Sequence, residues 1–182
     1  MSSKSIGNTF ERKVAKMFTE GIGEGDFIRT PSSGGFVGGK NTLRLATMGQ
    51  NQARLFQADL IPPDNWTHIF VECKRRKDFK WNQLFSIAGS KDFDSWIQQV
   101  YQHAKLDDGY FYFIVFGGSH TPIYISYCIE FSHQWIGSKN HILYSSIIFD
   151  KNIHFIIHEL TTDWLKQNKE LLRKKTDHGT TT

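Results

Sequence analysis

Two carboxylates and one amine lie in residues 57–74 at positions where they could act together. Residues 57–61 and 68–74 are strand-like, and the prolines between them cannot donate to a ladder, which favours a turn there. If the turn is centred between Asn65 and Trp66, Asp59 lies directly opposite Glu72. Cβ atoms of opposed residues are roughly 4.5–5.5 Å apart, and two like charges there are destabilising.

Glu72 and Lys74 are expected on one face of their strand, while Val71 and Cys73 point the other way. Two carboxylates on one small patch are tolerated if a divalent cation lies between them, and oxygen ligands suit Mg²⁺ or Mn²⁺. Such an ion polarises a phosphoryl oxygen and lowers the pKa of a bound water. Lys74 could orient that water or stabilise charge on the phosphate. The pattern therefore indicates metal-assisted hydrolysis of a phosphodiester.

A basic and aromatic cluster follows directly, and it suits contacts with phosphates and bases. It comprises Arg75, Arg76, Lys77, Phe79, Lys80 and Trp81. The total charge is only +4, so a nucleic-acid partner is indicated by this clustering and not by the total. The plain alternative is an exposed, ion-paired strand face beside a solvated basic run.

The remaining pattern predicts one α/β domain over residues 1–175, with a central mixed sheet flanked by helices and a disordered tail at 176–182. Residues 5–20 have helical periodicity, and Asn8 with Glu11 three residues later resembles a capping box. Further strands are expected at 26–30, 109–118, 122–131, 141–149 and 153–160, and helices at 81–105, with a break near 88–92, and at 161–175.

These features resemble the PD-(D/E)xK, or restriction-endonuclease-like, nucleases. Asp59 followed thirteen residues later by Glu72-Cys73-Lys74 resembles their D…(D/E)xK signature, and residues 5–105 follow the family's order of elements. Within the superfamily the chain is most similar to archaeal-type and phage Holliday junction resolvases, which share a G-x-x-x-E-R helix start and a serine-containing loop. It departs from the pattern at Ala58, where proline is frequent, and it lacks the Q-x-x-x-Y spacing of RecB-type exonucleases.

The resemblance implies a set of site residues. Glu11, Asp59, Glu72 and Lys74 would be catalytic, and the metal ligands would be Asp59, Glu72 and the backbone carbonyl of Cys73. Glu11 can equally be the cap residue of its helix, or serve both roles. The expected cofactor is Mg²⁺, with Mn²⁺ able to substitute. The residues expected to contact DNA are Arg29, Ser32, Ser33, Lys40, Arg44, Arg75, Arg76, Lys77, Gln98 and Gln99.

The function implied is Mg²⁺-dependent endonucleolytic cleavage of DNA, with four-way junctions as the expected substrate. A resolvase must cut two strands symmetrically, which predicts a homodimer, and aromatic strands such as residues 109–116 could contribute to its surface. Another nuclease of this fold, of the restriction or repair type, remains open. A catalytically inactive DNA-binding module of the same fold also remains open.

Other classes are disfavoured. Gly34, Gly39 and Lys40 fit a phosphate-binding loop, but Asn41 replaces the hydroxyl residue that would bind Mg²⁺. His154 and His158 lack the glutamate position of a metalloprotease helix and are expected in a core or edge strand. Two cysteines, no signal peptide and no apolar run of ~20 residues favour a cytoplasmic protein without a membrane partner. The family resemblance implies a prokaryotic, viral or phage origin.

Overall fold

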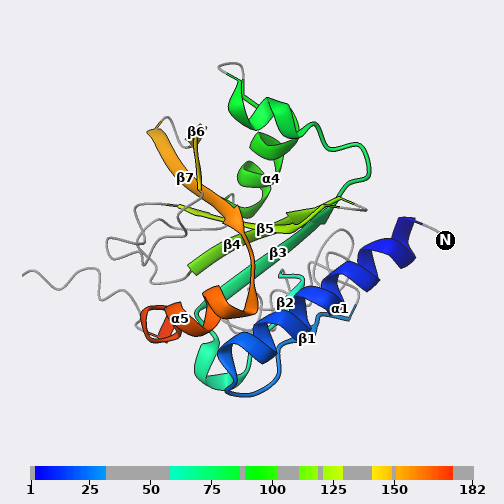
Figure 1. Cartoon of the computed structure of the whole chain (residues 1–182), viewed down its shortest axis with the longest axis vertical. Helices are drawn as coiled ribbons and strands as arrows, with labels where there is room; N and C mark the ends of the chain where they lie inside the picture. The colour runs from blue at the N-terminus through cyan, green and yellow to red at the C-terminus, as the bar shows by residue number, and fades with distance from the viewer. Residues whose placement is uncertain are drawn as a thin grey trace, which may run out of the picture.

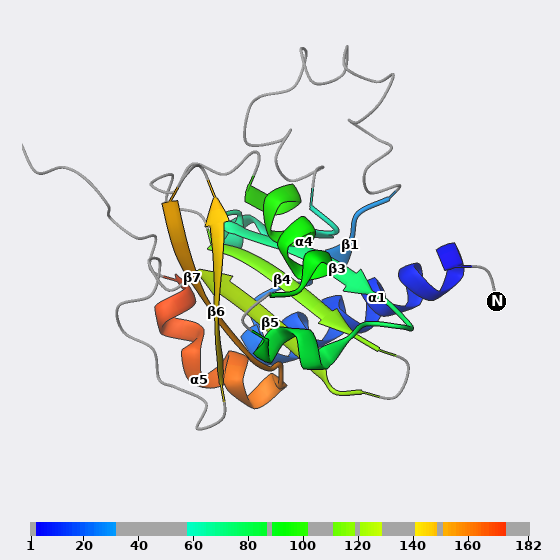
Figure 2. The same ribbon diagram turned by 90° about the horizontal axis from the view of Figure 1, so that it is seen from above.

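A five-stranded mixed sheet with helices on both faces forms the body of the computed structural model (Figures 1 and 2). The structure describes residues 3–31, 58–86, 89–101, 111–118, 121–128, 141–148 and 151–173. Its elements are α1 (Ser3–Ile22), β1 (Ile28–Arg29), β2 (Leu60–Ile61), η2 (Asp64–Trp66), β3 (Ile69–Arg75), η3 (Trp81–Phe85), α4 (Lys91–Tyr101), β4 (Phe111–Gly117), β5 (Ile123–Cys128), β6 (Ile142–Ile148), β7 (Lys151–Glu159) and α5 (Thr162–Arg173). The predicted α/β class and order of elements are confirmed.

The sheet has the strand order β3-β4-β5-β7-β6. β3 and β4 are parallel, and the connection between them contains α4, as a parallel pair requires a crossover. The remaining pairs are antiparallel. β1 and β2 form a separate two-stranded antiparallel sheet beside β3. The histidines at positions 154 and 158 lie in β7, which confirms the prediction of a strand there.

The aromatic strand β4 is the centre of the core, and all seven of its residues are buried. Successive side chains point to opposite faces, so Phe113 contacts Phe18 of α1 while Phe116 contacts Phe93 of α4. α1 and α5 therefore cover one face and α4 covers the other (Figure 1). The suggestion that residues 109–116 contribute to a dimer surface is wrong for the strand itself, because its side chains are enclosed on both sides.

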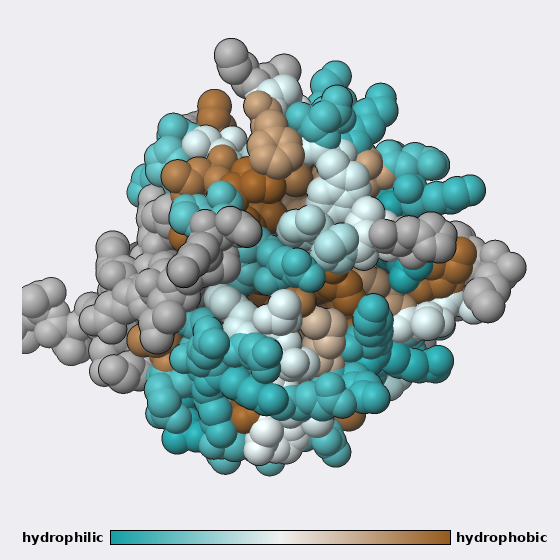
Figure 3. All heavy atoms as spheres, in the orientation of Figure 1, coloured by the Kyte–Doolittle hydropathy of each residue, from teal (hydrophilic) through white to brown (hydrophobic). Residues whose placement is uncertain are grey.

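The two outer strands of the sheet carry different surfaces. On β6, Leu143 and Ile147 are exposed, and Phe85 of the neighbouring η3 is exposed as well. Figure 3 shows hydrophobic surface gathered in the upper part of the view, where Figure 1 places β6 and α4. On β3, Glu72 is buried and polar groups line the outer edge. The β6 edge of the sheet is therefore apolar and exposed, whereas the β3 edge is polar and lies beside β2.

The capping-box prediction for the first helix is wrong. α1 begins at Ser3, five residues before the expected cap at Asn8, because residues 3–7 contain no proline and are part of the helix. Asn8 therefore lies inside α1, where its side-chain oxygen accepts a hydrogen bond from Arg29 Nη2 at 2.9 Å. Glu11 is consequently a mid-helix residue, and the alternative that it caps the helix is removed.

The predicted β-hairpin is replaced by a looser arrangement. β2 pairs with β1 and not with β3, and the turn after the two prolines contains η2. In the part of the chain that the structure describes, a backbone hydrogen bond from Asp59 N to Val71 O at 3.0 Å joins the segment before β2 to β3. Asp59 nevertheless lies alongside the part of β3 that contains Glu72. The two residues are therefore neighbours, as expected, although β2 and β3 do not form a hairpin.

Within the described part of the chain, no helix is both long and apolar enough to cross a membrane. Four of the residues expected to contact DNA, Ser32, Ser33, Lys40 and Arg44, and the predicted tail at 176–182 lie outside the described residues.

Candidate active site

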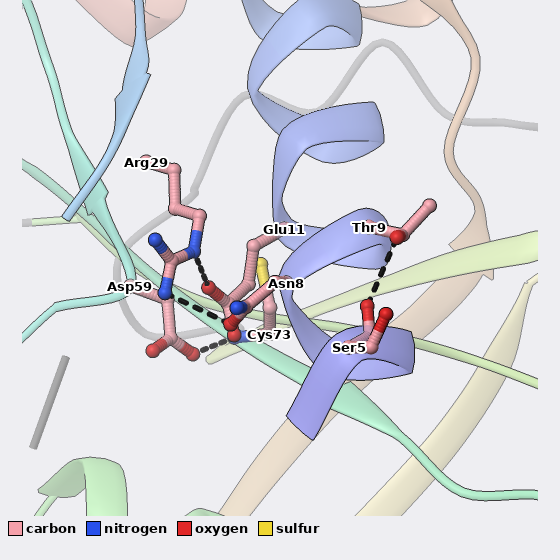
Figure 4. Close-up of polar contacts among 7 residues, drawn as sticks. All are labelled: Ser5, Asn8, Thr9, Glu11, Arg29, Asp59 and Cys73. Carbon is pink, nitrogen blue, oxygen red and sulfur yellow. Dashed lines mark hydrogen bonds and ion pairs between the residues drawn. The ribbon is translucent and has the colours of Figure 1, made fainter. Parts of the chain in front are cut away.

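Asp59 is held against the outer edge of β3 by two hydrogen bonds. Its backbone N–H donates to the Val71 carbonyl, and its Oδ2 accepts from the Cys73 backbone N–H at 2.8 Å. The residue is only 8% exposed. Figure 4 shows the contact between Asp59 and Cys73. Because Val71 and Cys73 flank Glu72 in β3, the backbone of Asp59 is fixed beside the part of the strand that contains the second predicted acid.

Glu72 and Lys74 form an ion pair on the face of β3 that is directed toward α4. Lys74 Nζ lies 2.7 Å from Glu72 Oε1, which confirms that the two side chains share a face. Gln99 of α4 joins them: its Oε1 accepts from Lys74 Nζ at 2.7 Å and its Nε2 donates to Glu72 Oε1 at 3.3 Å. Gln99 was grouped with the DNA-contacting residues in the sequence, yet here it also holds the acid and the lysine.

Glu11 approaches the same edge from α1, on the opposite face of the sheet. Its Oε2 accepts from Arg29 Nε at 2.6 Å, and the two side chains are 13% and 20% exposed. Figure 4 shows the Arg29 side chain reaching toward Glu11 and Asn8, with Asp59 beside them. The pair formed by Arg29 with Glu11 and Asn8 was missed in the sequence, because it joins residues 18 and 21 positions apart across two elements.

The carboxylates at this edge oppose one another's ionisation. Burial, followed by the charge of Asp59, raises the pKa of Glu72 to about 7, although Lys74 acts in the opposite direction. Burial and Asp59 also raise the pKa of Glu11 against the effect of Arg29. Burial raises the pKa of the Cys73 thiol well above its usual value, which keeps it neutral. Desolvated like charges are costly, so the site favours binding of a further cation.

The oxygen atoms at the edge of β3 fit a hard divalent cation. The N–H and C=O of one strand residue point to the same edge, so the Cys73 carbonyl lies on the side where its N–H meets Asp59. Among the described residues, no group of three His, Cys, Asp or Glu side chains is arranged to hold a metal. The protein's share would be Asp59, Glu72 and one carbonyl, a small set of the kind Mg²⁺ accepts because it retains several waters.

The chain is similar to a known protein family over almost its whole length. The model of a family described as "Phage putative PDDEXK endonuclease" matches residues 2–174. The chain belongs to this PDDEXK endonuclease family. A search of curated proteins and a search of solved structures each gave no match. Membership confirms the predicted PD-(D/E)xK nuclease class and implies DNA as the substrate, while the narrower similarity to Holliday junction resolvases stays a prediction.

The basic run at the end of β3 is divided between residues that contact other side chains and residues exposed to solvent. The Arg75 guanidinium lies 5.7 Å from the centre of the Phe10 ring of α1, and Arg76 pairs with Asp92 of α4. Lys77 is exposed, as is Gln98. Their roles in binding DNA remain predictions. The structure thus brings four predicted residues, Glu11, Asp59, Glu72 and Lys74, to the edge of β3, together with Arg29, Gln99 and the Cys73 backbone.

Proposed function

We propose that this chain is a Mg²⁺-dependent DNA endonuclease acting on branched DNA, with the four-way junction as its main substrate. The observation that carries the catalytic part is the group of Asp59, Glu72 and Lys74 at one edge of the sheet, with the pKa of Glu72 raised to about 7. Two desolvated acids beside a lysine are costly to fold, and they are useful where a metal ion and a phosphodiester are to be bound.

Each side chain has a distinct part in this proposal. Asp59, Glu72 and the Cys73 carbonyl hold the ion, and the Cys73 N–H fixes the orientation of Asp59. When bound, Mg²⁺ supplies polarisation of the phosphoryl oxygen and a more acidic water, and Mn²⁺ is expected to substitute. Lys74 remains 19% exposed, so its ammonium can donate to a phosphate oxygen or position the attacking water while still contacting Glu72.

The preference for branched DNA is supported by the sequence resemblance to resolvases. The helix start Gly7-x-x-x-Glu11-Arg12 fits their pattern, and Glu11 is near enough to Asp59 for that charge to raise the pKa of Glu11. Symmetric cleavage of a junction requires two active sites, and we therefore propose a homodimer. A mass measurement by light scattering at working concentration tests it, and a monomer would contradict it.

The experiment for substrate and chemistry compares four DNAs: a synthetic junction, a linear duplex, a single strand and a flap. Each is incubated with the wild-type protein with and without Mg²⁺ or Mn²⁺. We expect metal-dependent cleavage with the junction cut fastest. Preferred cleavage of the duplex would indicate a restriction-type enzyme, and preferred cleavage of the flap would indicate a repair-type enzyme. Salt-sensitive binding without any cleavage would instead identify an inactive DNA-binding module.

A matched pair of variants distinguishes a catalytic role of Lys74 from the general effect of removing one positive charge. Lys74→Ala removes the amine at the site, while Lys169→Ala removes an amine that pairs with Glu24 where α1 and α5 meet. Both variants lose one positive charge in a partly buried ion pair. Only Lys74→Ala is expected to stop cleavage, and equal activity of the two variants would contradict the proposal.

A further inference from the structure

Backbone pairing brings Arg29 to the metal edge of the sheet. β1 and β2 are antiparallel with Arg29 opposite Leu60, the residue after Asp59. The Thr30 N–H also donates to the Asp59 carbonyl at 2.9 Å. The short two-stranded sheet therefore fixes the backbone of Arg29 next to that of Asp59. The guanidinium is held near the metal edge by this pairing, unlike that of an arginine on an open surface.

The guanidinium is engaged by two residues of α1. Arg29 Nε donates to Glu11 Oε2 at 2.6 Å, and Nη2 donates to Asn8 Oδ1 at 2.9 Å. Both members of the ion pair are mostly buried, at 20% and 13% exposure for Arg29 and Glu11. Charge-assisted hydrogen bonds of this length are among the stronger ones in proteins. Glu11 is thus already neutralised by a cation that belongs to the chain (Figure 4).

We propose that the active site binds a single divalent cation, at Asp59 and Glu72, and that the Arg29 guanidinium takes the place of a second cation next to Glu11. The inference rests on the proposed function, because it concerns the same metal site. It assigns Arg29 a role at the active site in addition to, or in place of, the predicted contact with DNA. Glu11 is then a positioning residue that holds Arg29 and not a ligand of the bound ion.

The ion pair between Arg29 and Glu11 favours one bound cation over two. Arg29 pairs with Glu11 at 2.6 Å and both side chains are mostly buried, so this carboxylate keeps little charge with which to attract a second ion. In two-metal sites the ions are roughly 3.5–4 Å apart and share ligands. A second ion beside Glu11 would meet the guanidinium at close range and would have to displace it.

The test counts bound Mn²⁺ by the electron paramagnetic resonance signal of the free ion, with the full chain and without any cleavage assay. Wild type is expected to bind one ion. Glu11→Gln is expected to bind one ion with almost unchanged affinity, whereas loss of a true ligand would weaken binding about tenfold or more. Arg29→Met is expected to admit a second ion, and combining Arg29→Met with Glu11→Gln is expected to restore a count of one.

Arg173→Met is the matched control, because Arg173 also pairs with a glutamate, Glu24, but lies on α5. Its count is expected to equal that of wild type. Two ions in wild type, a tenfold weaker ion in Glu11→Gln, or an unchanged count of one in folded Arg29→Met would each overturn the inference. Should Arg29→Met fail to fold, the first two measurements still decide. Two ions in wild type would leave the nuclease proposal standing, whereas no bound ion would overturn both.

Discussion

Two groups of polar residues contact the same helix, α4, and differ in what faces their carboxylates: one contains the partly buried Asp94 and the other the buried Glu72. At the start of α4, Asp94 Oδ1 accepts hydrogen bonds from the Tyr144 hydroxyl at 2.9 Å and from the Ser146 hydroxyl at 2.8 Å. The tyrosine oxygen in turn accepts from the Ser90 N–H. The Asp94 carboxylate is thus hydrogen-bonded to two neutral hydroxyl groups. Near the other end of α4, Gln99 meets Glu72, which faces a second acid.

The comparison shows that the neighbours of a carboxylate decide how much free energy is lost when it is withdrawn from water. The two hydroxyl groups donate hydrogen bonds to Asp94 and carry no charge that would repel the carboxylate. Burial is the main cause that raises the pKa of Tyr144 to about 12, so its hydroxyl stays protonated. Glu72 has Asp59 as a neighbour, and its pKa rises to about 7. The first arrangement stabilises the fold, whereas the second reduces stability and leaves a site that gains from a bound cation.

The largest effect should come from removing the site's charges. Lys74→Ala and Asp59→Asn are each expected to lower the rate of single-turnover DNA cleavage by roughly three orders of magnitude, because one preorganised electrostatic group contributes about that much. Asp94→Asn, in the other group, should retain the wild-type rate at a temperature where it is fully folded. Full activity of Lys74→Ala or Asp59→Asn would remove the contrast between the two groups.

The next effect is on stability and its dependence on pH. A carboxyl whose pKa rises from 4.5 to about 7 on folding favours the folded state fully below pH 4.5, and this contribution is lost as the pH rises toward 7. The metal-free wild type should therefore lose up to roughly 3 kcal/mol of unfolding free energy across that window. Glu72→Gln should remove the loss and be the more stable protein at pH 8. Urea unfolding at pH 5 and pH 8 measures both, and a Glu72→Gln variant less stable at pH 8 would contradict the explanation.

Asp94→Asn should have the opposite sign. It exchanges two charge-assisted hydrogen bonds for neutral ones and removes a negative charge from the first turn of α4. We expect a loss of about 1–2 kcal/mol at pH 8, measured by the same urea unfolding. Glu72→Gln and Asp94→Asn both replace a carboxylate by a neutral amide. A change of stability in the same direction in both variants would contradict the explanation that Asp94 stabilises the fold and Glu72 destabilises it.

The smallest effect is expected for Gln99→Ala. Its amide bridges Glu72 and Lys74, but these two residues still contact each other directly when the amide is removed. Cleavage should slow about fivefold, which corresponds to roughly 1 kcal/mol for one hydrogen bond. Gln98→Ala, an exposed neighbour on the same helix, is the control for a role limited to DNA contact. Equal losses in both variants would indicate DNA binding alone.

Local pattern in the sequence was enough to predict much of the fold. Strand alternation put Glu72 and Lys74 on one face, and their 2.7 Å ion pair confirms it. The Phe-rich strand β4 and the helix α4 were also recognisable, because apolar periodicity depends only on near neighbours. The capping box at Asn8 was wrong because the same short pattern fits the interior of a helix whenever another partner uses the side chain.

The sequence by itself determined which acids and which lysine are available and the elements that carry them, because these features are encoded within a few residues of one another. Only the tertiary structure decided that β2 pairs with β1 and not with β3, and that Arg29 consequently reaches Glu11. It also decided that Gln99 meets Glu72 and Lys74. Such contacts join distant segments, and their energy depends on burial and on neighbouring charges that appear only when the chain has folded.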